Sequence, residues 1–88
     1  MKYRATENFW KKFYRLPSEQ KESVRSVWTI FKVNPFDPSL GTHRINSLSA
    51  QYKKTIYSVV VEADLRIVFY IETDTVHTVD IGTHSIYK

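Results

Sequence analysis

Hydrophobic and polar residues alternate along the second half of the chain, and this pattern predicts three consecutive strands. The predicted strands are Tyr52–Glu62, Leu65–Glu72 and Thr75–Thr83, all rich in β-branched and aromatic residues. Ala63-Asp64 and Thr73-Asp74 are short connections, so neighbouring strands are expected to form antiparallel hairpins.

Alternation within the middle predicted strand separates two faces of the sheet. One face carries the apolar side chains of Leu65, Ile67, Phe69 and Ile71, and the other carries Arg66, Val68 and Tyr70. We expect the Leu65 face to cover helices, which leaves Arg66 and Tyr70 on an open face.

The last predicted strand ends in a glycine followed by a histidine. Val76, Thr78 and Asp80 fall on one side of this strand, and His77, Val79 and Ile81 fall on the other. A glycine at a strand end lets the backbone bend and a ligand approach. His84, two residues after Gly82, is therefore expected at the rim of the sheet and is the first candidate for the centre of a site.

Helical periodicity dominates the first half. After a short strand at Met1–Ala5, Thr6 is placed to cap a helix with one apolar stripe, which Pro17 ends. Ser18 is the expected N-cap of a second helix that runs through Val33. The stripe of the first helix consists of Phe9, Trp10, Phe13 and Tyr14, and the buried face of the second consists of Val24, Val27, Trp28 and Phe31.

Two prolines mark the middle of the chain as a loop. The stretch Asn34–Pro38 is turn-rich, because residues before proline are disfavoured in helical conformation. Gly41–Ile45 leads out of this loop, and Asn46–Gln51 is expected to be a short turn or loop.

These elements predict a single α+β domain spanning residues 1–88. In it, an N-terminal helical hairpin packs on a small, twisted, antiparallel sheet that the short N-terminal strand joins. No cysteine is present, and neither a signal peptide nor an apolar stretch of transmembrane length is apparent. We therefore expect a cytoplasmic protein that does not contact membranes.

The net charge and the motifs of the sequence limit which partners and which types of reaction are expected. The formal net charge of +4 favours polyanions or an acidic protein partner. Phosphate-binding glycine loops, nucleophile elbows and HExxH motifs are absent from the sequence, and the carboxylates are scattered. Strand parity places His77 opposite to Asp80, so these side chains and His84 are not expected to share a metal ion. No cofactor is expected.

A set of cations and imidazoles remains, interleaved with tyrosines. Such a set suits metal-independent cleavage of RNA, in which the 2′-OH attacks the adjacent phosphate. One group removes the proton, another protonates the leaving oxygen, and Arg or Lys stabilises the anionic transition state. Aromatic rings can stack an unpaired base. The set comprises His43, Arg44, Lys53, Lys54, Arg66, His84 and Lys88, with Tyr57, Tyr70 and Tyr87.

The order of segments along almost the whole chain resembles the RelE/ParE toxin superfamily of type II toxin–antitoxin modules. The resemblance rests on three pieces in particular: Leu40–Ile45 with Leu48, the segment Asp64–Val68, and Gly82–Tyr87. It implies a ribosome-dependent mRNA endonuclease held inactive by a cognate acidic antitoxin, with operator DNA contacted only through the antitoxin complex.

The resemblance also implies roles for individual residues. Arg66 matches the family's phosphate-stabilising arginine, and His84 occupies the position of a catalytic His or Arg. Tyr87 matches the aromatic residue that stacks on the nucleotide, and His43 resembles a histidine that some members place after the long loop. Arg44, Lys53, Lys54, Tyr57, Tyr70 and Lys88 are the expected RNA-binding residues.

One departure leaves the general base open. Several active members carry a Lys pair or a His on the first of the three strands, where this sequence has Tyr57–Val60. His84 is the first choice of base and His43 the second. Two other functions stay open: a ParE-like inhibitor of DNA gyrase, and a catalytically degenerate module that binds only an antitoxin or operator DNA.

Overall fold

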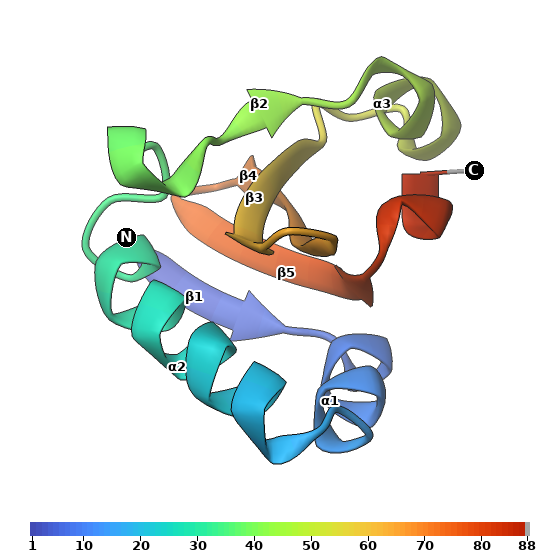
Figure 1. Cartoon of the computed structure of the whole chain (residues 1–88). Coiled ribbons are helices and arrows are strands. Elements are labelled where there is room, and N and C mark those ends of the chain that lie inside the picture. Colours follow the sequence, from blue (N-terminus) through green and yellow to red (C-terminus); the bar gives the residue numbers. More distant parts are fainter. Residues whose placement is uncertain (88) are drawn as a thin grey trace.

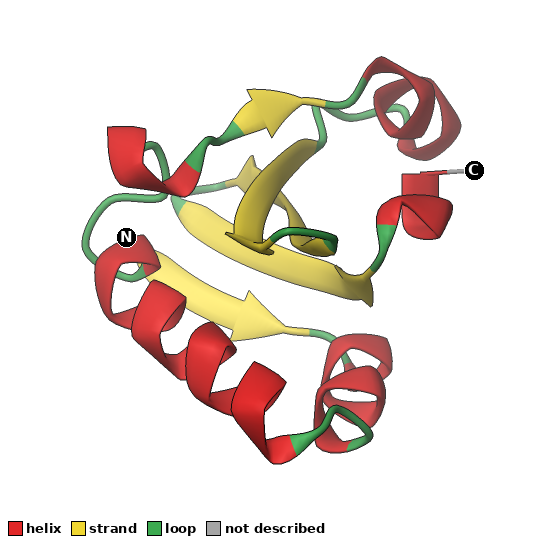
Figure 2. Cartoon of the chain, viewed as in Figure 1, coloured by secondary structure: helices red, strands yellow, loops and turns green. Residues whose placement is uncertain are grey.

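One five-stranded sheet organises the molecule (Figure 2). The computed structural model describes residues 1–87, with the backbone alone at His84. The strand order is β1-β5-β4-β3-β2, with β1 parallel to β5 and the other pairs antiparallel. The sheet is therefore mixed rather than purely antiparallel. Its strands are β1 (Lys2–Ala5), β2 (His43–Arg44), β3 (Tyr57–Glu62), β4 (Leu65–Glu72) and β5 (Thr75–Gly82).

The helices divide into two groups. In Figure 1 the two N-terminal helices lie beside β1 and diverge from the turn that joins them, whereas α3 and the C-terminal turn lie together at the other end. This arrangement confirms the expected α+β fold, with an N-terminal helical pair and an N-terminal strand in the sheet. The helical segments are α1 (Glu7–Tyr14), α2 (Ser18–Phe31) and α3 (Asn46–Tyr52), with single 3₁₀ turns η1 (Pro38–Leu40) and η2 (His84–Tyr87).

Helix α1 begins as its sequence predicts. The hydroxyl oxygen of Thr6 accepts a hydrogen bond from the Phe9 backbone N–H at 3.2 Å, which satisfies one of the free donors of the first turn. The predicted apolar stripe is only half buried, since Trp10 is 42% exposed and Tyr14 66% exposed. The aromatic surface of α1 thus continues onto the outside of the molecule.

A first core lies between the N-terminal helices and the sheet. Phe31 of α2 is fully buried and meets Phe69 of β4 edge to face, with 5.0 Å between ring centroids. Leu65 and Ile67 belong to the same cluster, so the Leu65 face of β4 covers the helices as predicted. Helix α2 itself ends at Phe31, two residues before the predicted end.

The segment predicted as a turn or loop at Asn46–Gln51 is instead the helix α3. Ile45, at its N-cap, offers no side-chain hydrogen bond to the first turn, so the local sequence gives little sign of a helix. Tertiary contacts compensate for this: the buried Ser49 hydroxyl donates to the Ile45 carbonyl and accepts from the Ile56 N–H, both at 2.8 Å. Strand β3 consequently begins at Tyr57 rather than at Tyr52.

A second, smaller core covers much of the sheet face that was predicted to be open. Val68 of β4 packs there with Leu48 of α3, and Tyr70 and Tyr87 border the cluster. The expectation of an open face around Arg66 and Tyr70 was therefore wrong, because α3 and η2 fold back over the middle of it. Arg66 and Tyr70 remain half-buried at its margins.

Strand β5 contains a bulge that changes its side-chain parity. Phe69 pairs with Thr78, but Val68 pairs with Asp80, so Val79 is an extra residue. As a result Val79 joins the second core while Ile81 joins the first. The predicted assignment of both residues to one side was wrong, because regular alternation does not continue through a bulge.

None of the helices in the described part of the chain is long and apolar enough to span a membrane.

Candidate functional site

His43 and Arg66 lie on the same face of the sheet. His43 pairs with Ser58 across β2 and β3, and Ser58 pairs with Val68 on β4. Directly paired residues share a face, and Arg66 is two residues from Val68, so all of these side chains project to one side. Strand spacing places the Cα atoms of His43 and Arg66 about 12 Å apart, within reach of a single phosphodiester for two long side chains.

The imidazole of His43 is exposed and oriented by the backbone. Its Nδ1 lies 3.1 Å from the carbonyl oxygen of Gly41. A carbonyl only accepts, so in the neutral ring this contact keeps the proton on Nδ1 and leaves Nε2 unprotonated. His43 therefore presents a hydrogen-bond acceptor to solvent, which is the form that a general base requires.

The backbone conformation and the surroundings of Gly41 both favour glycine at this position. Its φ of 58° lies in the left-handed region, and a Cβ added there would come within 3.3 Å of Cγ2 of Val60. The carbonyl that orients His43 is thus fixed by a turn that glycine favours.

The guanidinium of Arg66 has unused hydrogen-bonding capacity. Nη1 donates to the Glu62 carbonyl at 3.1 Å, but Nε is buried without a partner. An unpaired buried donor costs about 1–3 kcal/mol. A bound anion that drew the guanidinium outward would satisfy this donor.

Hydrogen bonds from the side chain and to the backbone of Tyr87 hold this residue in place. Its hydroxyl forms a hydrogen bond with the hydroxyl of Ser58, which is fully buried in β3. Its carbonyl accepts from the Ser47 hydroxyl at 3.2 Å. These contacts hold η2 against α3 and the middle of the sheet.

Two predicted site residues fall outside what the structure describes. Nothing is described for Lys88, and the side chain of His84 also lies outside the described residues. The turn η2 begins at the backbone of His84, two residues after Gly82, and Gly82 pairs with Arg66. The start of this turn is thus close to Arg66 in the sheet.

Tyr57 lies on the opposite face from Tyr70. Its ring stacks on Phe69 with 5.4 Å between centroids and meets Phe36 edge to face at 5.0 Å. It packs against the first core, on the helix side of the sheet. The structure therefore does not bring Tyr57 together with the other predicted RNA-binding tyrosine.

The ring of Tyr70 is in contact with an imidazole and with an ammonium group. The ring of His77 lies 4.7 Å from it at 17°, and the Lys54 ammonium lies 4.7 Å from the same centroid. Lys54 also pairs with Glu72, and this hydrogen bond raises the pKa of Lys54 and lowers the pKa of Glu72. These contacts occupy part of the Tyr70 ring surface on which a base would stack in its predicted role.

Three of the predicted cations line one polar depression of about 360 Å³ beside α3. They are Arg44 from β2, and Lys53 and Lys54 from the segment after α3. Asn46 and Thr55 also line it, and none of its lining residues carries a carboxylate. The structure therefore brings these three cations together around one depression.

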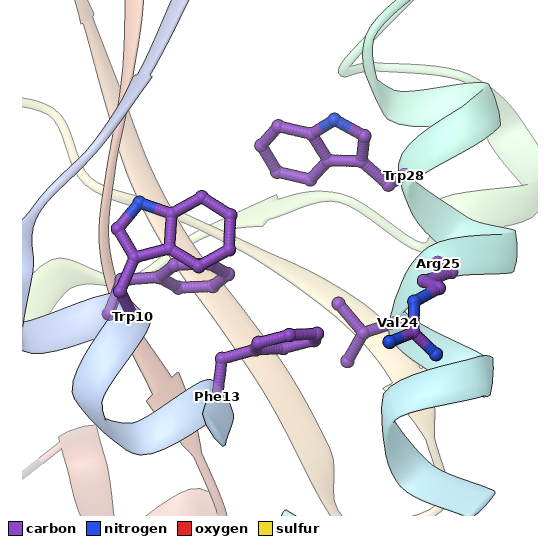
Figure 3. Close-up of a pocket in the computed structure, with 6 residues that line it drawn as sticks. Trp10, Phe13, Val24, Arg25 and Trp28 are labelled. Atoms are coloured by element: carbon purple, nitrogen blue, oxygen red, sulfur yellow. The ribbon is translucent and has the colours of Figure 1, made fainter. Parts of the chain in front are cut away.

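A second hollow has the opposite character. It lies between α1 and α2, measures about 240 Å³, and is lined mainly by aromatic side chains. Figure 3 shows Trp10 and Phe13 facing Val24 and Trp28 across it, with the Arg25 guanidinium at one side. This aromatic hollow suits apolar side chains rather than an RNA backbone.

The sequence prediction placed His77 and Asp80 on opposite sides of the strand, which argued against a shared metal ion. Because of the bulge at Val79, alternation no longer separates these two residues. Asp80 is nevertheless engaged, since its Oδ1 accepts from the Lys12 ammonium at 2.7 Å and from the Ile81 N–H at 2.8 Å. The described side chains contain no group of three or more His, Cys, Asp or Glu residues that could hold a metal ion.

Ser58 is the site residue that sequence reasoning missed. A serine among valines in a strand shows no special signal, and only the fold brings Tyr87 to it from 29 positions away. Gly41 was visible as one of only two glycines in the chain. Its link to His43 depends on a turn that the sequence does not specify.

Solved structures show what this fold is similar to. RelE from Pyrococcus horikoshii, in a RelE–RelB complex, superposes with a TM-score of 0.72 at 9% identity, covering 93% of this chain and 92% of that one. A YoeB/ParE toxin from Agrobacterium tumefaciens gives 0.73 at 19% identity, covering 96% and 99%. The chain has the RelE/ParE toxin fold.

YafQ from Escherichia coli extends the likeness, with a TM-score of 0.71 at 16% identity over 96% of this chain and 93% of YafQ. No protein-family model matches the sequence, and no curated protein matches it. At these identities the likeness establishes the fold alone, so the function has to be argued from the site.

Proposed function

We propose that this chain is the toxin of a type II toxin–antitoxin module and cleaves mRNA on the ribosome without a metal ion. The observation that carries this proposal is the shared face of His43 and Arg66, next to the turn that begins at His84. A base and a phosphate-binding cation placed on one face are the minimum that 2′-OH attack on a phosphodiester requires. The likeness to RelE, YoeB/ParE and YafQ over almost the full length also supports this chemistry.

The proposed reaction uses His43 as the base. Nε2 of His43 takes the proton of the 2′-OH, and the 2′-oxygen then attacks the adjacent phosphorus. The P–O5′ bond breaks, which gives a 2′,3′-cyclic phosphate and a 5′-hydroxyl end. Arg66 stabilises the charge on the phosphoryl oxygens.

A second group has to protonate the leaving 5′-oxygen, and His84 is our candidate. Its place at the start of η2, two residues after the partner of Arg66, supports this assignment. His43 is therefore preferred over His84 as the general base, which reverses the order of the sequence prediction. The reason is that a hydrogen bond orients the ring of His43.

An acidic antitoxin is the proposed protein partner. RelE of P. horikoshii was crystallised in complex with RelB, and this chain has a net charge of +4. We expect an acidic segment to cover the basic surface near Arg66, with affinity that falls as salt rises. A dissociation constant that is equal at low and high salt would contradict this electrostatic picture.

Induced expression in a bacterial host tests the function. Wild type is compared with Arg66→Ala, His84→Ala and Arg15→Ala, and cellular mRNA is mapped by primer extension. Arg15 is the matched control, because it is exposed and belongs to the end of α1, away from the proposed site.

The proposal predicts growth arrest with translation-dependent cuts inside reading frames for the wild type and Arg15→Ala. The cuts should vanish in the folded Arg66→Ala and His84→Ala proteins. Growth arrest with intact mRNA would refute the endonuclease and favour the gyrase inhibitor. No arrest at all would favour a module that only binds an antitoxin.

A further inference from the structure

Helix α1 takes over from β1 along the edge of β5. The last pair between these two strands joins Ala5 to Thr78, and Figure 1 shows the chain turning from the end of β1 into α1. Beyond this pair β1 offers no partner to β5. The carbonyl of Val79 accepts instead from the Thr6 hydroxyl and from the Asn8 side-chain amide, both at 3.1 Å. Side chains at the start of α1 thus satisfy the backbone of the extra residue in the bulge.

An ion pair fastens the next residue of β5 to the same helix. Asp80 Oδ1 accepts from the Lys12 ammonium at 2.7 Å and from the Ile81 N–H at 2.8 Å. The Asp80 side chain is 19% exposed, so its carboxylate lies largely inside the protein. Contacts from α1 therefore hold both Val79 and Asp80, the two residues of the bulge that stand opposite Val68.

The bulge decides which residue of β5 lies opposite Arg66. Without the extra residue, regular pairing would place Ile81 opposite Arg66 and would turn Asp80 toward the first core. A carboxylate among apolar side chains is costly, which disfavours that register. With the extra residue, Ile81 belongs to the first core and Gly82 lies opposite Arg66.

The turn η2 packs directly on Gly82. A Cβ added there would come within 2.7 Å of Cγ2 of Ile86, closer than Cβ atoms approach their neighbours, so a side chain in this place would push η2 away. A slip of β5 by one residue would shift the start of η2 by about 3.3 Å. A displacement of about 1 Å can already lower a reaction rate about 100-fold. The register of β5 thus sets where the turn that begins at His84 stands relative to Arg66.

We propose that α1 acts as a clamp on the bulge of β5, and that Thr6, Asn8 and Lys12 are positioning residues for the cleavage site. They act through β5 and not by contact with the RNA. By holding the bulge they fix the register of β5, and hence the place of η2 beside Arg66. The effect on cleavage rests on the proposed function, whereas the clamp itself is a property of the fold.

Three variants of α1 separate the clamp from the stability of the helix. Asn8→Asp removes the amide donor to Val79 and places a negative charge in the first turn, where the helix dipole favours it. Lys12→Met removes the ammonium group and keeps the apolar stem, whereas Lys12→Arg keeps a cation for the ion pair. Thr6 is left unchanged because its hydroxyl also caps the helix. Lys11→Met is the matched control, because Lys11 is exposed and forms no ion pair within residues 1–87.

NMR spectroscopy of the folded proteins measures the clamp independently of cleavage. In the wild type we expect nuclear Overhauser effects between Val68 and Asp80, and between Gly82 and a methyl group of Ile86. Both effects should weaken in each disruptive variant, vanish when the two are combined, and persist in the control and in Lys12→Arg. Effects of full strength in the combined variant would overturn the clamp.

Cleavage on the ribosome tests the positioning role. We expect kcat to fall about tenfold or more in Asn8→Asp and Lys12→Met at unchanged KM, since a displaced η2 weakens interactions made in the transition state. Lys12→Arg should restore the rate that Lys12→Met loses, and Lys11→Met should match the wild type. Assays well below the unfolding temperature of every variant keep a loss of stability from lowering kcat.

Two kinetic results would overturn the positioning role. One is a wild-type kcat in the combined variant after its Overhauser effects have vanished, and the other is a rise in KM with no loss of kcat. If the wild type never cleaves mRNA but the combined variant loses the Overhauser effects, the clamp stands and the endonuclease fails.

Discussion

Ser58 and Tyr87 connect the centre of the sheet to the C-terminal turn through a hydrogen bond between their hydroxyl groups. Ser58 has no exposed surface, whereas Tyr87 is half-buried. In this chain Tyr87 therefore has a positioning role, whether or not it also stacks on a nucleotide. Its hydroxyl and its carbonyl both hold η2, which begins at His84.

Removing either hydroxyl should destabilise the fold. We expect Ser58→Ala and Tyr87→Phe each to lower the free energy of unfolding by about 1–2 kcal/mol, because each leaves the other hydroxyl without this partner. The double variant should lose less than the sum of the two, by about 1 kcal/mol. Urea denaturation of the four proteins measures this coupling, and strictly additive losses would show that the two hydroxyls do not stabilise each other.

Gly41→Ala should lower both stability and cleavage. The left-handed backbone conformation costs a residue with a Cβ about 1–2 kcal/mol, and the added carbon presses against Val60. Movement of this turn would displace the carbonyl that orients His43. Gly41→Asn should lose less stability, since asparagine tolerates this conformation, and thermal unfolding of both variants checks the order. Equal stability of wild type and Gly41→Ala would show that the turn is not constrained in this way.

The pair of Lys54 and Glu72 makes a pH-dependent contribution to stability. The lowered pKa of Glu72 means that its contribution is fully present above the ordinary carboxyl pKa and disappears as pH falls through the lowered value. The raised pKa of Lys54 means that its contribution is present below the ordinary lysine pKa and is lost as pH rises through the raised value.

Wild type should therefore exceed Glu72→Gln in stability near neutral pH, by a small amount because the pair is at the surface. The difference should shrink in acid, at a pH below the lowered pKa of Glu72. Urea denaturation of both proteins at the two pH values measures it, and a difference that grows in acid would contradict the assigned pairing.

Sequence periodicity is enough to predict β4, the cap at Thr6 and the division of β4 into a helix-covering face and a second face. These features depend on neighbours within one element, where alternation and capping act directly. Helix α3 was not predicted because contacts with other segments, made by Ser47, Leu48 and Ser49 among others, stabilise it. The bulge at Val79 was not predicted for the same reason, because the register between two strands depends on both of them and not on the pattern within one.

The candidate site shows the same limit. Residue types and order single out Arg66 and His43, but they do not show that the two share a face. Alternation placed Tyr70 on an open face, whereas its ring is in contact with Lys54 and His77. Contacts between segments far apart in sequence decide which side chains a ligand can reach.

Cleavage of a defined mRNA on purified ribosomes, with analysis of the ends produced, is the most direct test of the proposed chemistry. Wild type, His43→Gln, Arg66→Gln and the control Arg15→Gln are compared after circular dichroism has shown that each is folded. We predict 2′,3′-cyclic phosphate and 5′-hydroxyl ends for the wild type and Arg15→Gln, and rates at least about 100-fold lower for the other two. Full activity of His43→Gln and Arg66→Gln, or products that carry a 5′-phosphate, would contradict a metal-independent 2′-OH mechanism at this face of the sheet.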